Sequence, residues 1–375
     1  LKTAERGRAQ ILSQALGNVP EKQSILDLPL VQEVLKRQNE IVMDYSLTND
    51  ESFLWVITPK KLRWFRLPSH WLLHPRVDAY RQDVVDRPRT IEDSSALQEL
   101  YKTLVQPAES LIPKGSRVVV ISSKILSLIN FEALIVPGEH PHYWIEDVEV
   151  ETASSLALLA HSTPAGAKTA NRKKELLLVG APIPADNSLP VLKHAVEEMD
   201  RVRSHFPIDR ETIISGKDAV PQAYRASNPG QYRLIHIDAH SLPSDLSPLD
   251  SYIVLSPAAD NSYKLYAHEI EGAPLHADLV TISACYSAGS RWYQGEGIVG
   301  LGWAFLRAGA HQVVASLWAV DDASTPQLMD DFYGELSRGK SPGEALRDAK
   351  LNMLHSGGQR SKPYYWASLQ LYTGS

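Results

Sequence analysis

The chain has 375 residues, of which 43% are hydrophobic and 22% are charged, and its formal net charge is −6. These values are ordinary for a globular protein of one large domain or two compact ones, and the negative charge argues against a general nucleic-acid binder, because phosphate neutralisation needs a basic surface. No run approaches the ~20 apolar residues that cross a bilayer, the start of the chain is polar, and a single cysteine fits a reducing compartment, so we expect a cytoplasmic protein without membrane contact.

Residues 1–40 are polar and prone to form helices. Leu30, Val31, Val34 and Leu35 recur at helical spacing, which predicts a helix near the end of this segment. The chain begins at Leu1 rather than Met, which suggests a fragment or a processed product. Residues 1–40 are therefore expected either to pack on the following domain or to be the end of a preceding repeat region.

Residues 41–170 are expected to form a first half that contains β-strands. Short β-prone runs are separated by turn residues, and one continuous apolar run is typical of a strand buried on both faces of a parallel sheet. The expected elements are strands at 41–46, 53–58, 62–67 and 117–122, and a helix at 94–105. A polar, basic loop at 164–174 ends this half.

Residues 171–375 alternate between strand and helix patterns, which indicates a parallel sheet covered by helices. The expected strands are 176–179, 212–214, 234–237, 252–255, 279–282 and 312–317, and the expected helices are 191–206, 219–226, 298–308 and 324–336. The glycines of the third helix, Gly300, Gly302 and Gly309, could allow close packing on the sheet. The polar loops 185–189 and 287–297 are candidates for regulatory segments.

Two apolar runs of this second half each end at a chemically reactive side chain. The run 232–241 is interpreted as a buried strand that ends in His240, and the run 278–285 ends at Cys285, the only cysteine of the chain. Ligands bind at the carboxyl edge of open α/β sheets, so two neighbouring strands of this kind would bring an imidazole and a thiol together. One cysteine cannot form an internal disulfide, which favours a role as nucleophile.

These runs carry a family resemblance. The run 232–241 resembles the strand that ends in the catalytic histidine of CHAT-domain proteins, which are caspase-like and separase-like cysteine peptidases of clan CD, often found after tetratricopeptide repeats. The run 277–285 is similar to their nucleophile strand. The resemblance covers roughly residues 40 to 375, and its other matching segments are 295–322, 332–336, 341–346, 365–369 and, more loosely, 130–137.

The resemblance implies an α/β fold, a caspase-like α/β/α sandwich in which a non-catalytic half (41–170) packs on a catalytic half (171–375). It implies that Cys285 is the nucleophile and His240 the acid/base partner. The backbone amides of Cys285 and Ser241 would form the oxyanion hole. The family usually has glycine where this chain has Ser241, and this departure could force a different backbone angle and disturb the preformed hole.

Two carboxylates that follow the strand at 313–317 are candidates for substrate selection. In the related separases, an acidic residue at a comparable place receives the basic side chain before the scissile bond. The resemblance carries this role to Asp322, with Asp321 as the second candidate, and a carboxylate would favour Arg over Lys because it matches the guanidinium group bidentately. The alternative is that Asp321 or Asp322 caps the helix that begins near Ser324.

Three other polar side chains near His240 leave alternatives open. His236 is expected to be a partly buried histidine with a possible supporting role, and Asp238 could orient an imidazole. Alternate residues of a strand share a face, so His236, Asp238 and His240 could also hold a metal ion in a hydrolase resembling the ureohydrolases. That alternative lacks the second aspartate of the ureohydrolase motif, because Leu242 stands there, and it leaves Cys285 without a role.

The sequence therefore predicts a cysteine endopeptidase that cleaves a protein substrate after a basic residue and needs no metal or other cofactor. The resemblance implies control by preceding tetratricopeptide repeats or by an activating partner. It also implies a place in bacterial defence, with a gasdermin or a companion regulatory protein as substrate. The alternative from another class is a catalytically silent module that binds a peptide.

Overall fold

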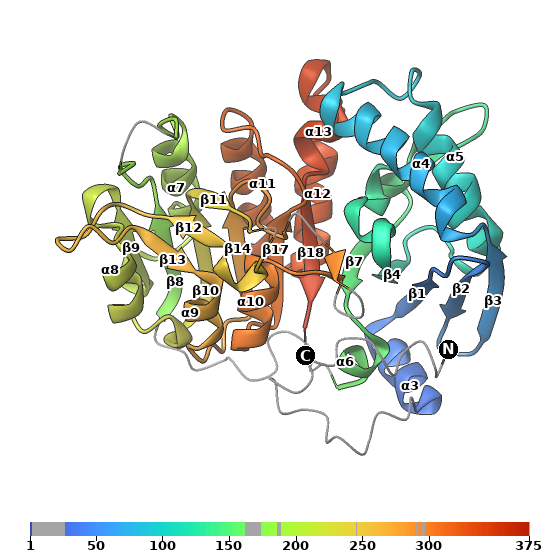
Figure 1. The fold of residues 1–375 in the computed structure, drawn as a ribbon, viewed down its shortest axis with the longest axis horizontal. Coiled ribbons are helices and arrows are strands. Elements are labelled where there is room, and N and C mark those ends of the chain that lie inside the picture. The colour runs from blue at the N-terminus through green and yellow to red at the C-terminus, as the bar shows by residue number, and fades with distance from the viewer. Residues whose placement is uncertain are drawn as a thin grey trace.

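The computed structural model describes residues 1, 27–161, 174–185, 189–244, 246–289, 292–293 and 297–374. Within them, eleven strands form one continuous mixed sheet that crosses the whole molecule (Figure 1). From edge to edge, its strands are β3 (Leu62–Leu67), β2 (Ser52–Ile57), β1 (Glu40–Ser46), β4 (Arg117–Ile121), β7 (Glu149–Ala153), β18 (Leu369–Thr373), β17 (Gln312–Ser316), β14 (Leu279–Ser283), β10 (Tyr232–Asp238), β8 (Lys174–Gly180) and β9 (Glu211–Ser215).

The sheet contains two groups of parallel strands that run in opposite directions, and the edge strands β2 and β3 pair antiparallel beyond β1. Strands β9, β8, β10, β14 and β17 are parallel to one another, and β18 is antiparallel to β17. On its other side β18 pairs in parallel with β7, which continues in parallel into β4 and β1. The last strand of the chain therefore joins the two halves, and Figure 1 shows α12 (Pro342–His355) standing between them.

Helices cover both faces of this sheet. Successive side chains of β1 point to opposite faces of the sheet, so each face has its own hydrophobic core. Met43 and Tyr45 lie in the main core, whereas Val42 lies in a smaller core with residues of α3 and α6 on the other face. Longer helices pack in the groups α4 with α5, α7 with α11, and α11 with α12. The other helices are α3 (Leu28–Gln38), α4 (His70–Arg81), α5 (Ser95–Leu104), α6 (Leu156–His161), α7 (Ala195–Arg203), α8 (Pro221–Ala226), α9 (Ala267–Glu271), α10 (Leu301–Ala308), α11 (Thr325–Ser337) and α13 (Pro363–Trp366).

The described residues also form three small sheets outside the main one. They are β11 (His240–Leu242) with β12 (Tyr252–Val254) and β13 (Lys264–Tyr266), β15 (Trp292–Tyr293) with β16 (Gly297–Ile298), and β5 (Ile135–Val136) with β6 (His142–Tyr143). The predicted α/β sandwich of two halves is confirmed. The helix predicted for residues 1–40 is found as α3, and residues 2–26 lie outside the described residues. No helix in the described part of the chain has the length and apolar character needed to cross a membrane.

Three sequence predictions need correction. His240 does not end the buried strand, because β10 stops at Asp238 and His240 begins β11 in a separate sheet. The helix predicted at 191–206 is shorter and starts at Ala195, and the helix predicted from 298 starts at Leu301 after β16. Gly302 does pack closely on the sheet, where an added Cβ would lie 3.2 Å from Cβ of Ala315.

Candidate functional site

The turn that carries Cys285 is held rigidly at the end of β14. Ser287 and Ser316 are both buried, and the amide of each donates to the hydroxyl of the other, at 3.1 and 2.9 Å. Tyr286 has a φ of 52°, a left-handed conformation that a non-glycine residue adopts at a cost. Such strain persists only where the surrounding structure enforces it, and it is concentrated at functional sites.

The thiol of Cys285 is partly buried between the end of β14 and the loop after β17. Burial raises its pKa, a hydrogen bond with the backbone of Val320 opposes that shift, and the nearby Asp322 carboxylate adds to it. Tyr364 lies on the same side, because its phenol interacts electrostatically with both Cys285 and Asp321. In this state the thiol is protonated at neutral pH.

His240 is the first residue of β11, and the next residue, Ser241, contacts the nucleophile turn. Nε2 of His240 lies 2.7 Å from the carbonyl oxygen of Pro190, so Nε2–H donates to that carbonyl. This bond fixes the orientation of the ring and leaves Nδ1 as the nitrogen that can accept a proton. The strands that precede the two residues, β10 and β14, are neighbours in the sheet, as the strand-end prediction required.

Ser241 ties the histidine loop to the nucleophile turn. Its hydroxyl donates to the carbonyl oxygen of Cys285 at 2.5 Å. Ser241 lies in the extended strand β11 and is not among the residues with positive φ, so serine fits this position without backbone strain. The departure from glycine therefore supplies a contact between the two loops.

The two candidate aspartates have different partners. Asp321 holds the first turn of α11, because its Oδ1 accepts from the amide of Ser324 at 2.9 Å and its carbonyl accepts from the hydroxyl of Thr325. Asp322 turns away from that helix. Its carboxylate accepts from the amides of Lys193 and His194, at 3.0 and 3.3 Å, just before α7 begins. The alternative that one of the two aspartates caps α11 therefore applies to Asp321. Asp322 lies instead at the N-terminal, positive end of the α7 dipole.

His236 and Asp238 lie deeper and away from His240. His236 is fully buried, its Nδ1 lies 3.2 Å from the hydroxyl of Tyr333, and burial lowers its pKa to about 4. Asp238 is also buried, and its charged neighbours are Glu198, His236 and Asp322. Neither residue contacts the imidazole of His240 through a described hydrogen bond. Among the described residues, no group of three or more His, Cys, Asp or Glu side chains is arranged to hold a metal ion.

Sequence reasoning missed four contributors to this region: Pro190, Glu198, Val320 and Tyr364. The carbonyl of Pro190 and the backbone of Val320 act through main-chain atoms, which no residue type reveals. Glu198 lies in a segment that was predicted to be helical, and its burial against the sheet could be found only from the fold.

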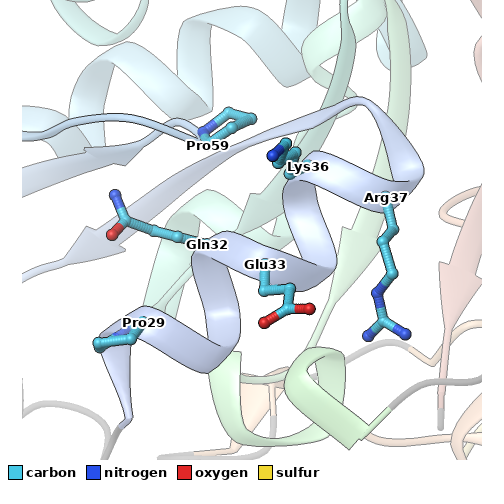
Figure 2. A pocket seen from close by; sticks show the side chains of 6 residues that line it. All are labelled: Pro29, Gln32, Glu33, Lys36, Arg37 and Pro59. Atoms are coloured by element: carbon cyan, nitrogen blue, oxygen red, sulfur yellow. The ribbon is translucent and has the colours of Figure 1, made fainter.

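A separate hollow of about 670 Å³ lies along α3 in the first half (Figure 2). Its lining residues are Pro29, Gln32, Glu33, Lys36, Arg37 and Pro59. None of the predicted site residues is among them. Figure 2 shows Glu33 and Arg37 pointing away from Pro59, so these side chains do not converge on one point as in a binding site.

Comparisons with known proteins agree with this architecture. Tetratricopeptide repeat protein 28 is 31% identical over 107 residues in Homo sapiens and 32% identical in Mus musculus; the match spans 28% of this chain and 4% of those proteins. The crystal structure of the Saccharomyces cerevisiae separase–securin complex superposes with a TM-score of 0.57 at 11% identity, over 97% of this chain and 33% of that chain. At this identity the superposition shows a shared fold, the caspase-like fold of separase.

The family model of the CHAT domain matches residues 94–374, which is most of the chain. This range includes both loops that carry Cys285 and His240, as well as the strand β18 that joins the two halves. The chain therefore belongs to the CHAT-domain family.

Proposed function

We propose that the protein is a cysteine endopeptidase with Cys285 as nucleophile and His240 as its acid/base partner. The observation that carries the proposal is the junction of the two loops, where Ser241 binds the carbonyl of Cys285 while Pro190 orients His240. His240 Nδ1 takes the thiol proton, the thiolate attacks the carbonyl carbon of the peptide bond, and the imidazolium returns the proton to the leaving amine. Water then hydrolyses the thioester.

The developing oxyanion needs donors that are in place before the reaction. We assign this role to the backbone amide of Cys285 and, as second donor, to that of Ser241. The enforced left-handed turn at Tyr286 supports this assignment, because it fixes the orientation of the peptide units around the nucleophile.

Asp322 selects a basic side chain before the scissile bond in this proposal. Its carboxylate is an electrostatic neighbour of the Cys285 thiol. Bonds from the amides before α7 hold it in one orientation and stabilise its negative charge. The carboxylate of Asp321 already accepts a hydrogen bond at the start of α11, so we assign Asp321 at most a supporting role in substrate selection.

Regulation and biological role extend the proposal beyond the site. The relatives of this chain in two mammals are tetratricopeptide repeat proteins, and the separase neighbour was solved in complex with securin. Both observations support control by preceding repeats or by a partner. A cytoplasmic role in bacterial defence, with a gasdermin or a companion regulator as substrate, rests on the family resemblance alone.

The test is cleavage of a peptide library that varies the residue before the scissile bond, with the Cys285→Ala chain as control. We expect cleavage after Arg, and less after Lys, that is absent from the control. Asp322→Asn should lower kcat/KM for these peptides by at least about tenfold without a matching loss for neutral ones. Cleavage after apolar residues only would remove the role of Asp322 and keep the peptidase.

The second candidate function is a silent peptide-binding module, and the resting thiol supports it. The Cys285 thiol is hydrogen-bonded to the backbone of Val320, and burial disfavours its ionisation. A chain that binds the library peptides but cleaves none of them, even after addition of an activating partner, would support this function and contradict the peptidase.

A further inference from the structure

A pair of buried carboxyl groups lies behind Asp322, away from the surface. Glu198 of α7 is 3% exposed and Asp238, the last residue of β10, is 5% exposed. Carboxyl groups are rarely buried this completely unless they are paired with a cation or serve a binding or catalytic role. None of the roles assigned so far uses Glu198.

The backbone places both groups next to the proposed site. Asp322 binds the amide of His194, and Glu198 follows four residues later, about one helical turn further along α7. Asp238 pairs across the sheet with Ser283, which lies two residues before Cys285. The hydroxyl of Ser283 in turn hydrogen-bonds Glu198. Asp322, Glu198 and Asp238 therefore form one group of acids that extends inward from the nucleophile.

No positive charge balances this group in the described part of the chain. The neighbours that act electrostatically on Glu198 and Asp238 are each other, Asp322 and His236, and the pKa of His236 is about 4, so its imidazole is neutral. Tyr333 of α11 completes the surroundings with a neutral phenol bonded to Thr281. Burial and acidic neighbours raise the pKa of Glu198 to about 8 and that of Asp238 well above its usual range.

Two polar atoms of this group also lack a satisfactory partner. Oδ2 of Asp238 makes no hydrogen bond. Oε1 of Glu198 lies 3.1 Å from Nε2 of His236, but neither atom makes a hydrogen bond of good geometry. Unsatisfied buried oxygens are costly, so they point to a ligand group that supplies donors.

We propose that Glu198 and Asp238 form the inner end of the specificity site, where they receive the guanidinium group of an arginine side chain that passes Asp322. The occupant follows from the proposed function, on which this assignment rests. A guanidinium group carries five N–H donors in a planar fork, so it can satisfy Asp322 and the deeper oxygens together. Lysine has a single ammonium group and would satisfy fewer of them.

Binding at this place is coupled to release of a proton. In the empty site the buried pair of Glu198 and Asp238 holds protons, because burial raises the pKa of both carboxyl groups. When the guanidinium group arrives, the O–H bonds of the pair break, the protons leave to solvent and the carboxylates pair with the bound cation. The affinity for an arginine side chain therefore increases with pH up to about pH 8, by at most about tenfold per pH unit for each proton released. An uncharged side chain of the same shape has no such dependence.

The experiment measures binding by titration calorimetry to the full Cys285→Ala chain, so that no turnover is needed. The probes are an N-acetylated tetrapeptide amide that ends in arginine and the same peptide ending in citrulline, a neutral analogue of similar shape. We expect the arginine peptide to bind at least tenfold more tightly at pH 8 than at pH 6, with proton release detected in buffers of different ionisation enthalpy. Adding Glu198→Gln should weaken this binding at least tenfold at pH 8 and reduce the number of protons released.

Glu197→Gln is the matched control, because Glu197 is the exposed neighbour of Glu198 on the same helix and binds Arg201 and His194. It should leave both affinities unchanged, and thermal unfolding should show that all variants are folded. Asp238→Asn gives a second, independent variant with the same expected loss.

The outcomes separate the two proposals. Equal affinity of the Glu198→Gln chain, equal binding of the arginine and citrulline peptides, or no binding of either peptide overturns the inner acidic site. Arginine-selective, proton-linked binding without cleavage by the Cys285 chain, even after addition of an activating partner, overturns the peptidase and keeps the site. If the protein cleaves after Arg and neither Glu198→Gln nor Asp238→Asn changes that cleavage, the inner acidic site is overturned and the peptidase is kept.

Discussion

At the scale of single residues, Cys285 combines a fixed position with low reactivity in the resting state. Burial and the Asp322 carboxylate both disfavour the thiolate, and only the backbone of Val320 favours it. A peptidase with this arrangement depends on His240, or on an approaching cation that neutralises Asp322, to produce the nucleophile. Substrate arrival and activation of the thiol would then be linked through one aspartate.

The single cysteine makes this reactivity measurable without interference. We expect alkylation of Cys285 by iodoacetamide to be slow at pH 7 and to accelerate by up to about tenfold per pH unit until the pH exceeds the usual pKa of a cysteine. Asp322→Asn should increase the rate at neutral pH, because it removes a negative charge next to the thiol. Mass spectrometry of the labelled chain gives the rate. A rate that levels off near pH 7 would contradict the protonated resting thiol.

The same residues show where the sequence alone was insufficient. Their positions near strand ends predicted that Cys285 and His240 share one region, because strand ends are readable from apolar runs. The sequence could not assign the roles of Asp321 and Asp322, because two adjacent aspartates differ only in where their side chains point. Asp321 accepts a hydrogen bond from the first turn of α11, and Asp322 accepts one from an amide just before α7. Glu198 was missed for a similar reason, because its burial depends on how α7 packs on the sheet.

At the scale of elements, buried polar contacts fasten α12 and β18 to the first half. Lys350 of α12 is fully buried and its ammonium group binds Glu132, while Asn130 donates to the same carboxylate and to the carbonyl of Ala367, the latter at 2.9 Å. Arg347 donates to the carbonyls at the end of the 144–148 turn. The contacts of Lys350 with Glu132 and of Asn130 with Ala367 connect segments more than two hundred residues apart in the sequence, so no local pattern could predict them.

The buried pair predicts a large and specific loss of stability. Lys350→Met leaves Glu132 buried without its cation and should lower the free energy of unfolding by about 3–5 kcal/mol. The double variant Lys350→Met with Glu132→Gln should recover most of it, because both charges are then absent. Urea unfolding followed by circular dichroism measures both effects.

Lys340→Met is the matched control for this prediction. Lys340 also sits in an ion pair, with Asp348, but its side chain is 42% exposed, and exposed pairs contribute at most about 1 kcal/mol. If Lys350→Met cost no more than Lys340→Met, the buried pair would not be what fastens the two halves.

At the scale of the whole molecule, the sheet continues across both halves and the hydrophobic core does as well. The main core includes Tyr80 of α4 and Leu100 of α5 in the first half and Phe332 of α11 in the second. The alternating strand and helix patterns predicted each half separately. They could not predict that β18 joins them, because the order of strands in a sheet depends on contacts distant in the sequence.

This continuity makes a prediction about the boundary of the family match. The CHAT-domain model begins at residue 94, yet residues 40–44 of β1 pair with all of β4, and Leu73, Val77 and Tyr80 of α4 lie in the main hydrophobic core. A fragment of residues 94–374 would expose the apolar edge of β4, where residues 118–121 are buried, and would lose the bond between Tyr80 and Asn130. An exposed, apolar strand edge favours aggregation, so we expect this fragment to be insoluble or unfolded. The full chain should instead unfold in one cooperative transition by calorimetry, since its halves share one core. A soluble 94–374 monomer with its own cooperative transition would show that β1 to β3 are an addition to an independent domain.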